Sequence, residues 1–325
     1  MKFGEAFMEY LHGEQDKFLE NCGHVDYKTL KKVLNTCRSC NTLRHSCSSD
    51  SSECQCHSCP LCDQKFFSEL MKEASQVAGC FSSRVRHLLH LHVATGMQRY
   101  ILSLRHCFKD DRKAMVLEGW MLIEYALMNA IAIRKILKKY DKIHGSVNGR
   151  KFKSKLRAEH VELLQSPWLI ELAAFYLNSN GSDDGGFKEA SSNFCCDFNA
   201  NPSVMTLMLP HLIKLEFDLT CAVCLDTVFN PYALSCGHLF CKSCACSSAS
   251  VFLLEGLKAA SPESKCPICR EVGVYTKAVH MLELDMLLKR RCKDYWKERL
   301  TEERAEMLTQ SKLYWGTHAR NAIGY

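Results

Sequence analysis

The chain has 325 residues, of which 47% are apolar; this content excludes a mostly disordered protein and fits two or three domains. Its net charge of +6 is too small for a large nucleic-acid-binding surface. The 21 cysteines would fit a disulfide scaffold in a secreted chain. Inside a cell, however, clustered Cys and His residues more often bind metal, and their spacing here favours metal.

No segment has the pattern of a signal peptide or of a membrane-spanning helix. Residues 1–18 lack a continuous apolar stretch. The most apolar segment, Trp120–Ile133, is interrupted by Glu124 and is too short to cross a bilayer. We therefore expect a soluble intracellular protein in the cytoplasm, the nucleus or both.

Helical periodicity dominates the first 177 residues, which we predict to form an all-α domain. Its first two periodic segments predict a helical hairpin and the later ones a bundle of long helices, with Pro167 beginning the last helix. The segments with apolar residues at helical spacing are 1–17, 27–34, 66–104, 109–142 and 152–177.

A Cys-rich insertion at 37–62 interrupts this pattern and has two interpretations. It could hold a third zinc ion, with Cys59-Pro60-Leu61-Cys62 as one pair of ligands and Cys37-Arg38-Ser39-Cys40 as another. Its high serine content instead favours a flexible loop.

The second half of the chain has three predicted parts. Residues 178–215 are rich in Gly, Ser and Asn at their start and predict a flexible linker. Residues 216–275 contain closely spaced Cys and His residues and predict a small α+β zinc module. Residues 276–325 predict a helical tail with alternating charges. The expected fold class is therefore mainly α with one zinc-stabilised module.

Eight potential zinc ligands occur in pairs within this module. Each close pair bends the backbone so that two side chains can reach one tetrahedral Zn²⁺. Histidine in the fourth place is the order of a RING domain, whereas a PHD finger has it fifth and a LIM domain third. In order, the ligands are Cys221, Cys224, Cys236, His238, Cys241, Cys244, Cys266 and Cys269.

The resemblance to RING domains implies two structural zinc ions held by interleaved ligand sets. Cys221, Cys224, Cys241 and Cys244 would bind the first ion, and Cys236, His238, Cys266 and Cys269 the second. Because all four positions of each ion are filled, zinc activates no water there. Its binding energy is instead folding energy, so loss of one ligand should unfold the module.

The same resemblance implies a ubiquitin ligase that forms no covalent intermediate with ubiquitin. Val223 and Pro267 match family positions that contact the ubiquitin-conjugating enzyme (E2). Arg270 matches a basic residue that contacts both the E2 and its linked ubiquitin. Many RING ligases have an aromatic residue after the sixth ligand, but here Ala245-Cys246-Ser247-Ser248 occupies that region. In RING ligases a shallow apolar groove receives the E2. Either this groove is shallower here, or Val251 and Phe252 fill it.

A run of lysines ends the long periodic segment at 109–142. Lys135, Lys138, Lys139 and Lys142 are spaced i, i+3, i+4 and i+7, so they share one face of a helix. Like charges at this spacing repel each other. The face is therefore either a solvated basic surface or an anion-binding site. Nucleic acid is not expected, because no aromatic residues for base stacking lie beside the lysines.

Three motifs together resemble an SPX domain: Met1-Lys2-Phe3-Gly4, Tyr27-Lys28-Thr29-Leu30-Lys31-Lys32 and the lysine helix. In that family the hairpin and the lysine helix bind inositol polyphosphates. Glu5 stands where many SPX domains have lysine, which puts the affinity in doubt. Carried over by position, the candidate ligands are Tyr27, Lys31, Lys135, Lys138, Lys139 and Lys142.

An SPX domain followed by a RING resembles the NLA/BAH group of plant ubiquitin ligases, as do Tyr295-Trp296-Lys297-Glu298-Arg299 and the ending Ile323-Gly324-Tyr325. The resemblance implies a role in phosphate or nitrate homeostasis, with membrane transporters as substrates and recruitment to the plasma membrane by them. The alternative is a phosphate-signal sensor or adaptor whose RING serves only for protein contacts.

Overall fold

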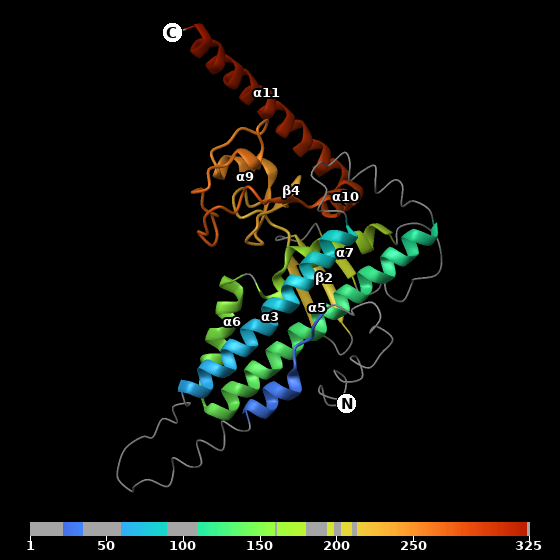
Figure 1. The fold of residues 1–325 in the computed structure, drawn as a ribbon. Coiled ribbons are helices and arrows are strands. Elements are labelled where there is room, and N and C mark those ends of the chain that lie inside the picture. The colour runs from blue at the N-terminus through green and yellow to red at the C-terminus, as the bar shows by residue number, and fades with distance from the viewer. Residues whose placement is uncertain are drawn as a thin grey trace, which may run out of the picture. The chain divides into compact units, whose positions relative to one another are not determined.

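The structure is a computed structural model that describes residues 22–34, 60–89, 109–159, 161–179, 194–197, 203–209 and 213–323. These residues are mainly helical, which confirms the predicted fold class (Figure 1). The chain forms two compact units, Met1–Leu89 with Leu117–Ser166, and His90–Val116 with Pro167–Tyr325. The predicted helix at 1–17 and most of the Cys-rich insertion lie outside the described residues.

The first unit is built on long helices. The predicted helix at 27–34 is present, and it is followed by α3 (Pro60–Leu88) and α5 (Lys109–His144). After α5 come α6 (Asn148–Ala158) and the short η2 (Leu163–Gln165). The chain reverses between α5 and α6 at Gly145, which has φ +55°. The Ser146 N–H donates to the Asp141 carbonyl at 3.1 Å, the bond that ends a helix in a Schellman motif.

The core of this unit lies between α3 and α5. Tyr140 of α5 is fully buried and stacks on Phe66 of α3 and on His144, with ring centroids 4.9 and 4.3 Å apart. Its hydroxyl donates to the Asp63 carboxylate. The other fully buried apolar side chains of the two helices include Leu70, Ala74, Val85, Leu122, Ile123, Ala126 and Ile136.

By length and composition alone, α5 is also apolar enough to cross a membrane between Ala114 and His144. Within the protein, however, 61% of the most apolar stretch of α5 is buried. The buried face packs on other helices of the same unit, as expected for a core helix.

Asp141 joins the end of α5 to the start of α6. Its carboxylate accepts the Gly149 N–H at 2.7 Å and the Arg150 N–H at 3.1 Å. It therefore satisfies two of the N–H groups that a helix start leaves unpaired. Gly149 approaches α5 so closely that an added Cβ would lie 2.6 Å from the Leu137 carbonyl oxygen. Only glycine fits this position.

The second unit contains α7 (Pro167–Ser179), two small sheets and the C-terminal helices. One sheet has the order β1-β2-β3, with β1 at Phe194–Asp197, β2 at Val204–Leu209 and β3 at Ile213–Asp218, all antiparallel. The zinc module carries β4 (Pro231–Ala233), β5 (Leu239–Cys241) and β6 (Val279–His280) in the order β5-β4-β6. The module also contains α9 (Lys242–Ser248) and η3 (Leu257–Ala259), and it is followed by the C-terminal helices α10 (Leu282–Arg291) and α11 (Lys293–Ile323).

The prediction of a flexible linker at 178–215 does not hold at β1, at β2 and at the start of β3, where the structure has strands. Met205 and Leu207 are fully buried, and they alternate with more exposed residues in β2. That period of two is the pattern of a half-buried strand. The Gly-rich composition of the preceding residues outweighed this short pattern in the sequence.

The predicted end of the helical domain at 177 also differs from the boundary between the units, which falls between Ser166 and Pro167. Pro167 begins α7, as predicted. However, α7 packs against α10 rather than within the first unit. The fully buried carboxylate of Glu171 accepts the N–H groups of Glu283 and Leu284 at 2.8 and 3.1 Å. These belong to the first turn of α10, so Glu171 caps that helix from another one.

We predict that Gly149→Ala destabilises the first unit by about 1–3 kcal/mol, because its methyl group would overlap the Leu137 carbonyl and separate α6 from Asp141. Thermal unfolding should show a lower Tm. Gly79→Ala is the matched control, since nothing lies within 4 Å of an added Cβ there. In the middle of α3 it should be neutral or stabilising by up to about 1 kcal/mol. A Gly149→Ala variant as stable as the wild type would contradict the close approach.

Candidate metal centre and lysine face

The structure gathers the eight predicted zinc ligands into the two predicted groups. Cys221, Cys224, Cys241 and Cys244 form one, and Cys236, His238, Cys266 and Cys269 form the other. Within each group the ligand atoms all lie within 4.8 Å of one another. The order of the groups along the chain is interleaved, so the two sites cross-link the module.

The distances between ligand atoms fit tetrahedral zinc. Cys224 Sγ and Cys241 Sγ are 3.7 Å apart, and a Zn–S bond of about 2.3 Å requires a tetrahedral edge of roughly 3.8 Å. In the second site, His238 Nδ1 lies 3.4 Å from Cys236 Sγ and 3.6 Å from Cys266 Sγ. Two Zn²⁺ ions are therefore the cofactors that these residues would hold.

Neighbouring thiols in the second group shift each other's pKa. The pKa of Cys236 is raised, first by its hydrogen bond to Cys266 and then by burial. That same hydrogen bond lowers the pKa of Cys266 to about 3. One thiolate is thus favoured at the expense of its neighbour. A bound Zn²⁺ stabilises all the thiolates of a site together. In the first site the Phe229 N–H donates to Cys241 Sγ at 3.2 Å, which supports the charge on that sulfur.

Two of the ligand pairs sit in matching turns, which we call the knuckles, at 221–226 and 266–271. The Leu225 N–H donates to the Cys221 carbonyl at 2.8 Å, and the Arg270 N–H to the Cys266 carbonyl at 3.0 Å. Leu225 and Arg270 both have φ +64°, a left-handed conformation that costs a non-glycine residue roughly 1–2 kcal/mol. An antiparallel bridge closes each knuckle, Thr220 to Thr227 and Lys265 to Val272.

Each knuckle presents an apolar side chain to solvent. Val223 is 43% exposed, and Ile268, at the same place in the other knuckle, is 47% exposed. Pro267 is half-buried, and Arg270 is exposed. Leu225 is 73% exposed. The sequence reasoning missed Leu225 and Ile268, although Ile268 could have been found by aligning the two Cys-x-x-Cys pairs.

Residues after the sixth ligand are packed inside the protein. Ala245 and Cys246 are buried. Burial raises the pKa of the Cys246 thiol to about 11, so it stays protonated and unreactive near neutral pH. Phe252 stacks edge-on against Tyr314 of α11 at 5.7 Å.

The helix α11 packs along the zinc module. From the sequence, residues 276–325 were predicted to form a helical tail separate from that module. Asn230 Nδ2 donates to Glu303 Oε1 at 2.8 Å, and the Leu253 N–H donates to Gln310 Oε1 at 2.8 Å. Further toward the start of α11, the Tyr295 hydroxyl donates to the Thr227 carbonyl. Residues of α11 from Tyr295 to Tyr314 thus contact the module.

The lysine face lies at the end of α5. Lys135, Lys138 and Lys142 are exposed, whereas Lys139 is half-buried. Burial and then repulsion from Lys31 lower the pKa of Lys139. The structure therefore brings Lys31, of the helix at 27–34, close to the α5 lysines. Tyr27 begins that helix and is half-buried.

Three lysines of the face, Lys138, Lys139 and Lys142, lie apart from the described carboxylates. Asp141 is the acidic residue within the run, and its carboxylate is directed to the start of α6. Among the described residues, no carboxylate lies within 4 Å of the Lys138, Lys139 or Lys142 ammonium group. Arg134 differs from them, because it pairs with Glu162 at 3.2 Å.

We predict that the purified chain contains two zinc ions. Cys236→Ala should lower this number and unfold the module, because the free energy of zinc binding stabilises the folded state. Zinc by mass spectrometry and the folded fraction by circular dichroism measure both effects. Cys292→Ala is the control, because Cys292 belongs to neither ligand group. Two zinc ions retained in Cys236→Ala would contradict the assignment.

Comparison with known proteins agrees with this geometry. Residues 221–260 match the RING-type zinc-finger family. Over the full length of both proteins, the chain is 60% identical to "Probable E3 ubiquitin-protein ligase BAH1-like" of Arabidopsis thaliana. It is 58% identical to "Probable E3 ubiquitin-protein ligase BAH1-like 1" of Oryza sativa subsp. indica and 43% identical to "E3 ubiquitin-protein ligase NLA" of Arabidopsis thaliana, again over both full lengths. The chain therefore belongs to the plant BAH1-like/NLA family of RING-type E3 ubiquitin-protein ligases, whose partners are an E2 and ubiquitin.

Proposed function

We propose that this ligase binds its E2 through the two knuckles and positions the linked ubiquitin with Arg270. The observation that carries this proposal is the matched exposure of Val223 and Ile268 on the two zinc-held turns. Exposed aliphatic side chains on rigid turns form a small apolar surface, and such anchors dominate binding when a partner covers them. Pro267 and Leu225 extend that surface.

The zinc ions take no part in ubiquitin transfer, because their four ligands are all from the protein. The role of the chain is to hold the loaded E2 in the conformation in which a substrate lysine attacks the thioester. This is catalysis by orientation. Arg270 suits it because a guanidinium can bond two partners at once. Its backbone is fixed by the bond to Cys266, so the side chain leaves the knuckle in a defined direction.

The first unit supplies a second activity, the binding of inositol polyphosphates. The proposed ligands are Tyr27, Lys31, Lys135, Lys138, Lys139 and Lys142. Lys31 and Lys139 repel each other, and the carboxylate of Asp141 is engaged elsewhere. A densely phosphorylated ring would relieve that repulsion by charge-assisted hydrogen bonds. The half-buried position of Lys139 strengthens such bonds, since water screens them less there.

The substrates and the cellular role are proposed from the family resemblance. Membrane phosphate or nitrate transporters are the proposed substrates, and phosphate or nitrate homeostasis is the proposed role. A ligase in the cytoplasm or nucleus would reach such substrates by recruitment to the plasma membrane. The inositol polyphosphate would report phosphate status to the ligase.

We expect Arg270→Ala to slow ubiquitin discharge from a loaded E2 by on the order of tenfold, because the variant loses orientation but keeps both zinc sites. Single-turnover discharge to free lysine, with a panel of E2 enzymes, measures the rate. Arg304→Ala is the matched control, an exposed arginine on α11. An unchanged rate in Arg270→Ala would remove Arg270 from the mechanism. An inactive wild type with every E2 would contradict the E2 surface.

We expect Lys139→Ala and Tyr27→Phe each to weaken the binding of inositol hexakisphosphate, the lysine variant by about 1.5–3 kcal/mol for the loss of a charge-assisted bond. Isothermal titration calorimetry gives the affinities. Lys312→Ala removes an equal charge from the other unit and should leave the affinity unchanged. Equal affinities for all four proteins would show that the anion binds elsewhere or only by net charge.

A further inference from the structure

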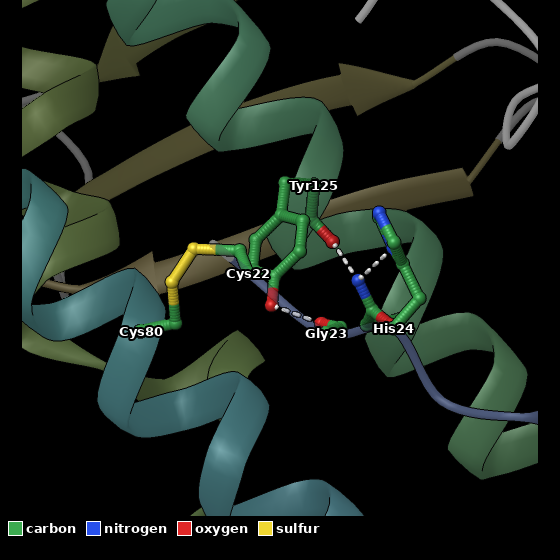
Figure 2. The surroundings of a disulfide bond; sticks show 6 residues. Cys22, Gly23, His24, Cys80 and Tyr125 are labelled. Atoms are coloured by element: carbon green, nitrogen blue, oxygen red, sulfur yellow. Dashed lines mark hydrogen bonds between the residues drawn. A yellow bond between two sulfur atoms is a disulfide. The ribbon is translucent and has the colours of Figure 1, made fainter. Parts of the chain in front are cut away.

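A disulfide joins the N-terminal part of the first unit to α3. Cys22 and Cys80 are bonded, with Cα atoms 5.8 Å apart, and they are separated by 58 positions in the sequence. That Cα separation is the commonest one for a disulfide. Figure 2 shows the bond beside Gly23, His24 and Tyr125. Cys22 is buried, whereas Cys80 is partly exposed.

The residues after Cys22 form a short segment, 22–26, that leads directly into the helix at 27–34. Hydrogen bonds fix this segment to α5: the Tyr125 hydroxyl donates to the Gly23 carbonyl at 2.7 Å, and the Val25 N–H donates to Asn129 Oδ1 at 2.9 Å. The segment is joined to α3 by the disulfide and by a hydrogen bond of 2.9 Å from the Asp26 N–H to Glu73 Oε2. The disulfide is therefore the covalent part of a clamp between two helices.

The clamp acts on residues of the lysine face. Tyr27 follows Cys22 by five positions, and Lys31 follows it by nine. Lys31 must stay close to Lys139 although the two ammonium groups repel each other. Without the covalent link, hydrogen bonds and the packing of the buried Leu30 and Leu34 would have to oppose that repulsion. Holding the helix at 27–34 in place removes part of the ordering cost of binding a polyanion.

We propose that Cys22 and Cys80 form a redox-active pair whose oxidation fixes the helix at 27–34 and tightens anion binding at the lysine face. This inference rests on the proposed function for the anion site. Disulfides inside cells are usually transient and regulatory rather than structural. The pair would therefore make the anion affinity of a ligase depend on the thiol balance of its surroundings.

Glutathione is the reaction partner by chemical class, a small thiol and its disulfide. In reduction, a glutathione thiolate attacks the Cys80 sulfur, which is the more exposed one, and Cys22 leaves as a thiolate and takes up a proton. A second glutathione thiolate attacks the glutathione sulfur of the mixed disulfide and releases the Cys80 thiol. Two electrons pass from two glutathione molecules to the protein, and one glutathione disulfide is formed. Oxidation follows the same steps in reverse.

Thermodynamic coupling between oxidation and anion binding sets the size of the effect in two different measurements. We expect the oxidised chain to bind inositol hexakisphosphate about fivefold more tightly than the reduced chain, a coupling at the low end of those seen between two sites. By reciprocity, saturating inositol hexakisphosphate should then lower the midpoint potential of the Cys22–Cys80 couple by about 20 mV, which is fivefold for two electrons.

The test uses the full-length, zinc-loaded chain in glutathione buffers of graded ratio. Alkylation and peptide mapping measure the Cys22–Cys80 disulfide separately from the other cysteines, and calorimetry measures the affinity in each state. Hydrogen exchange reports the amides of 23–34, which should exchange faster after reduction. Cys80→Ser should bind like the reduced wild type at every glutathione ratio. Cys22→Ser should do the same. If either variant fails to fold, the oxidised and reduced wild-type chains can still be compared with each other.

Three results would overturn the inference: no Cys22–Cys80 disulfide at any glutathione ratio, equal exchange at 23–34 in both states, or equal affinity in both states. If neither state binds inositol hexakisphosphate, the proposed anion site fails by itself. Exchange at 23–34 then decides the redox clamp, which stands if reduction speeds that exchange and falls if it does not.

Discussion

The crossing of the two zinc ligand groups is the constraint on which the second unit depends. Cys236 and His238 lie between the two pairs of the first group in the sequence but belong to the second group. The chain therefore enters the second site before it completes the first. Two filled tetrahedra add to the small apolar core of the module, which includes Val228, Phe240 and Leu253. Structural zinc contributes roughly 10–16 kcal/mol of binding energy per ion in small peptides. This energy offsets the cost of the left-handed backbone conformation at Leu225 and Arg270.

The frame set by zinc is extended by helices from both sides of the module in the sequence. α11 bonds to it through Glu303 and Gln310, and α10 is capped by the buried carboxylate of Glu171 in α7. A buried carboxylate without partners would be costly. Here its two oxygens each accept a backbone N–H, and the helix start supplies positive charge. α7 therefore belongs physically with the ligase module, although its apolar pattern looks like one more helix of the preceding bundle.

The parts of the protein that the sequence predicted are those whose chemistry fixes residue types at fixed spacing. The eight zinc ligands follow from the tetrahedral geometry of the metal, and the helices at 27–34 and 109–144 follow from their periodicity. The strands β1 and β2 were missed because four and six residues carry too little pattern against a Gly-rich background. The contacts of α11 were missed because they are made by polar side chains such as Gln310, which are equally common on exposed helices.

The two sites differ in whether their charge is already compensated. In the zinc groups a bound cation would offset much of the thiolate charge, and all four of its positions would be filled, so the site is closed to further ligands and serves as a scaffold. On the lysine face, Lys31 and Lys139 are held together by α5 and by the clamp at 22–26, while Asp141 is directed to the start of α6. Among the described residues, folding has therefore gathered Lys138, Lys139 and Lys142 with no carboxylate within 4 Å of their ammonium groups. Such an arrangement costs stability in the free protein, and a polyanion returns that energy on binding. Any change that lets Lys31 withdraw from Lys139 lowers the cost in the free state and the gain on binding together, which is why the position of one short helix can set the affinity of the whole face.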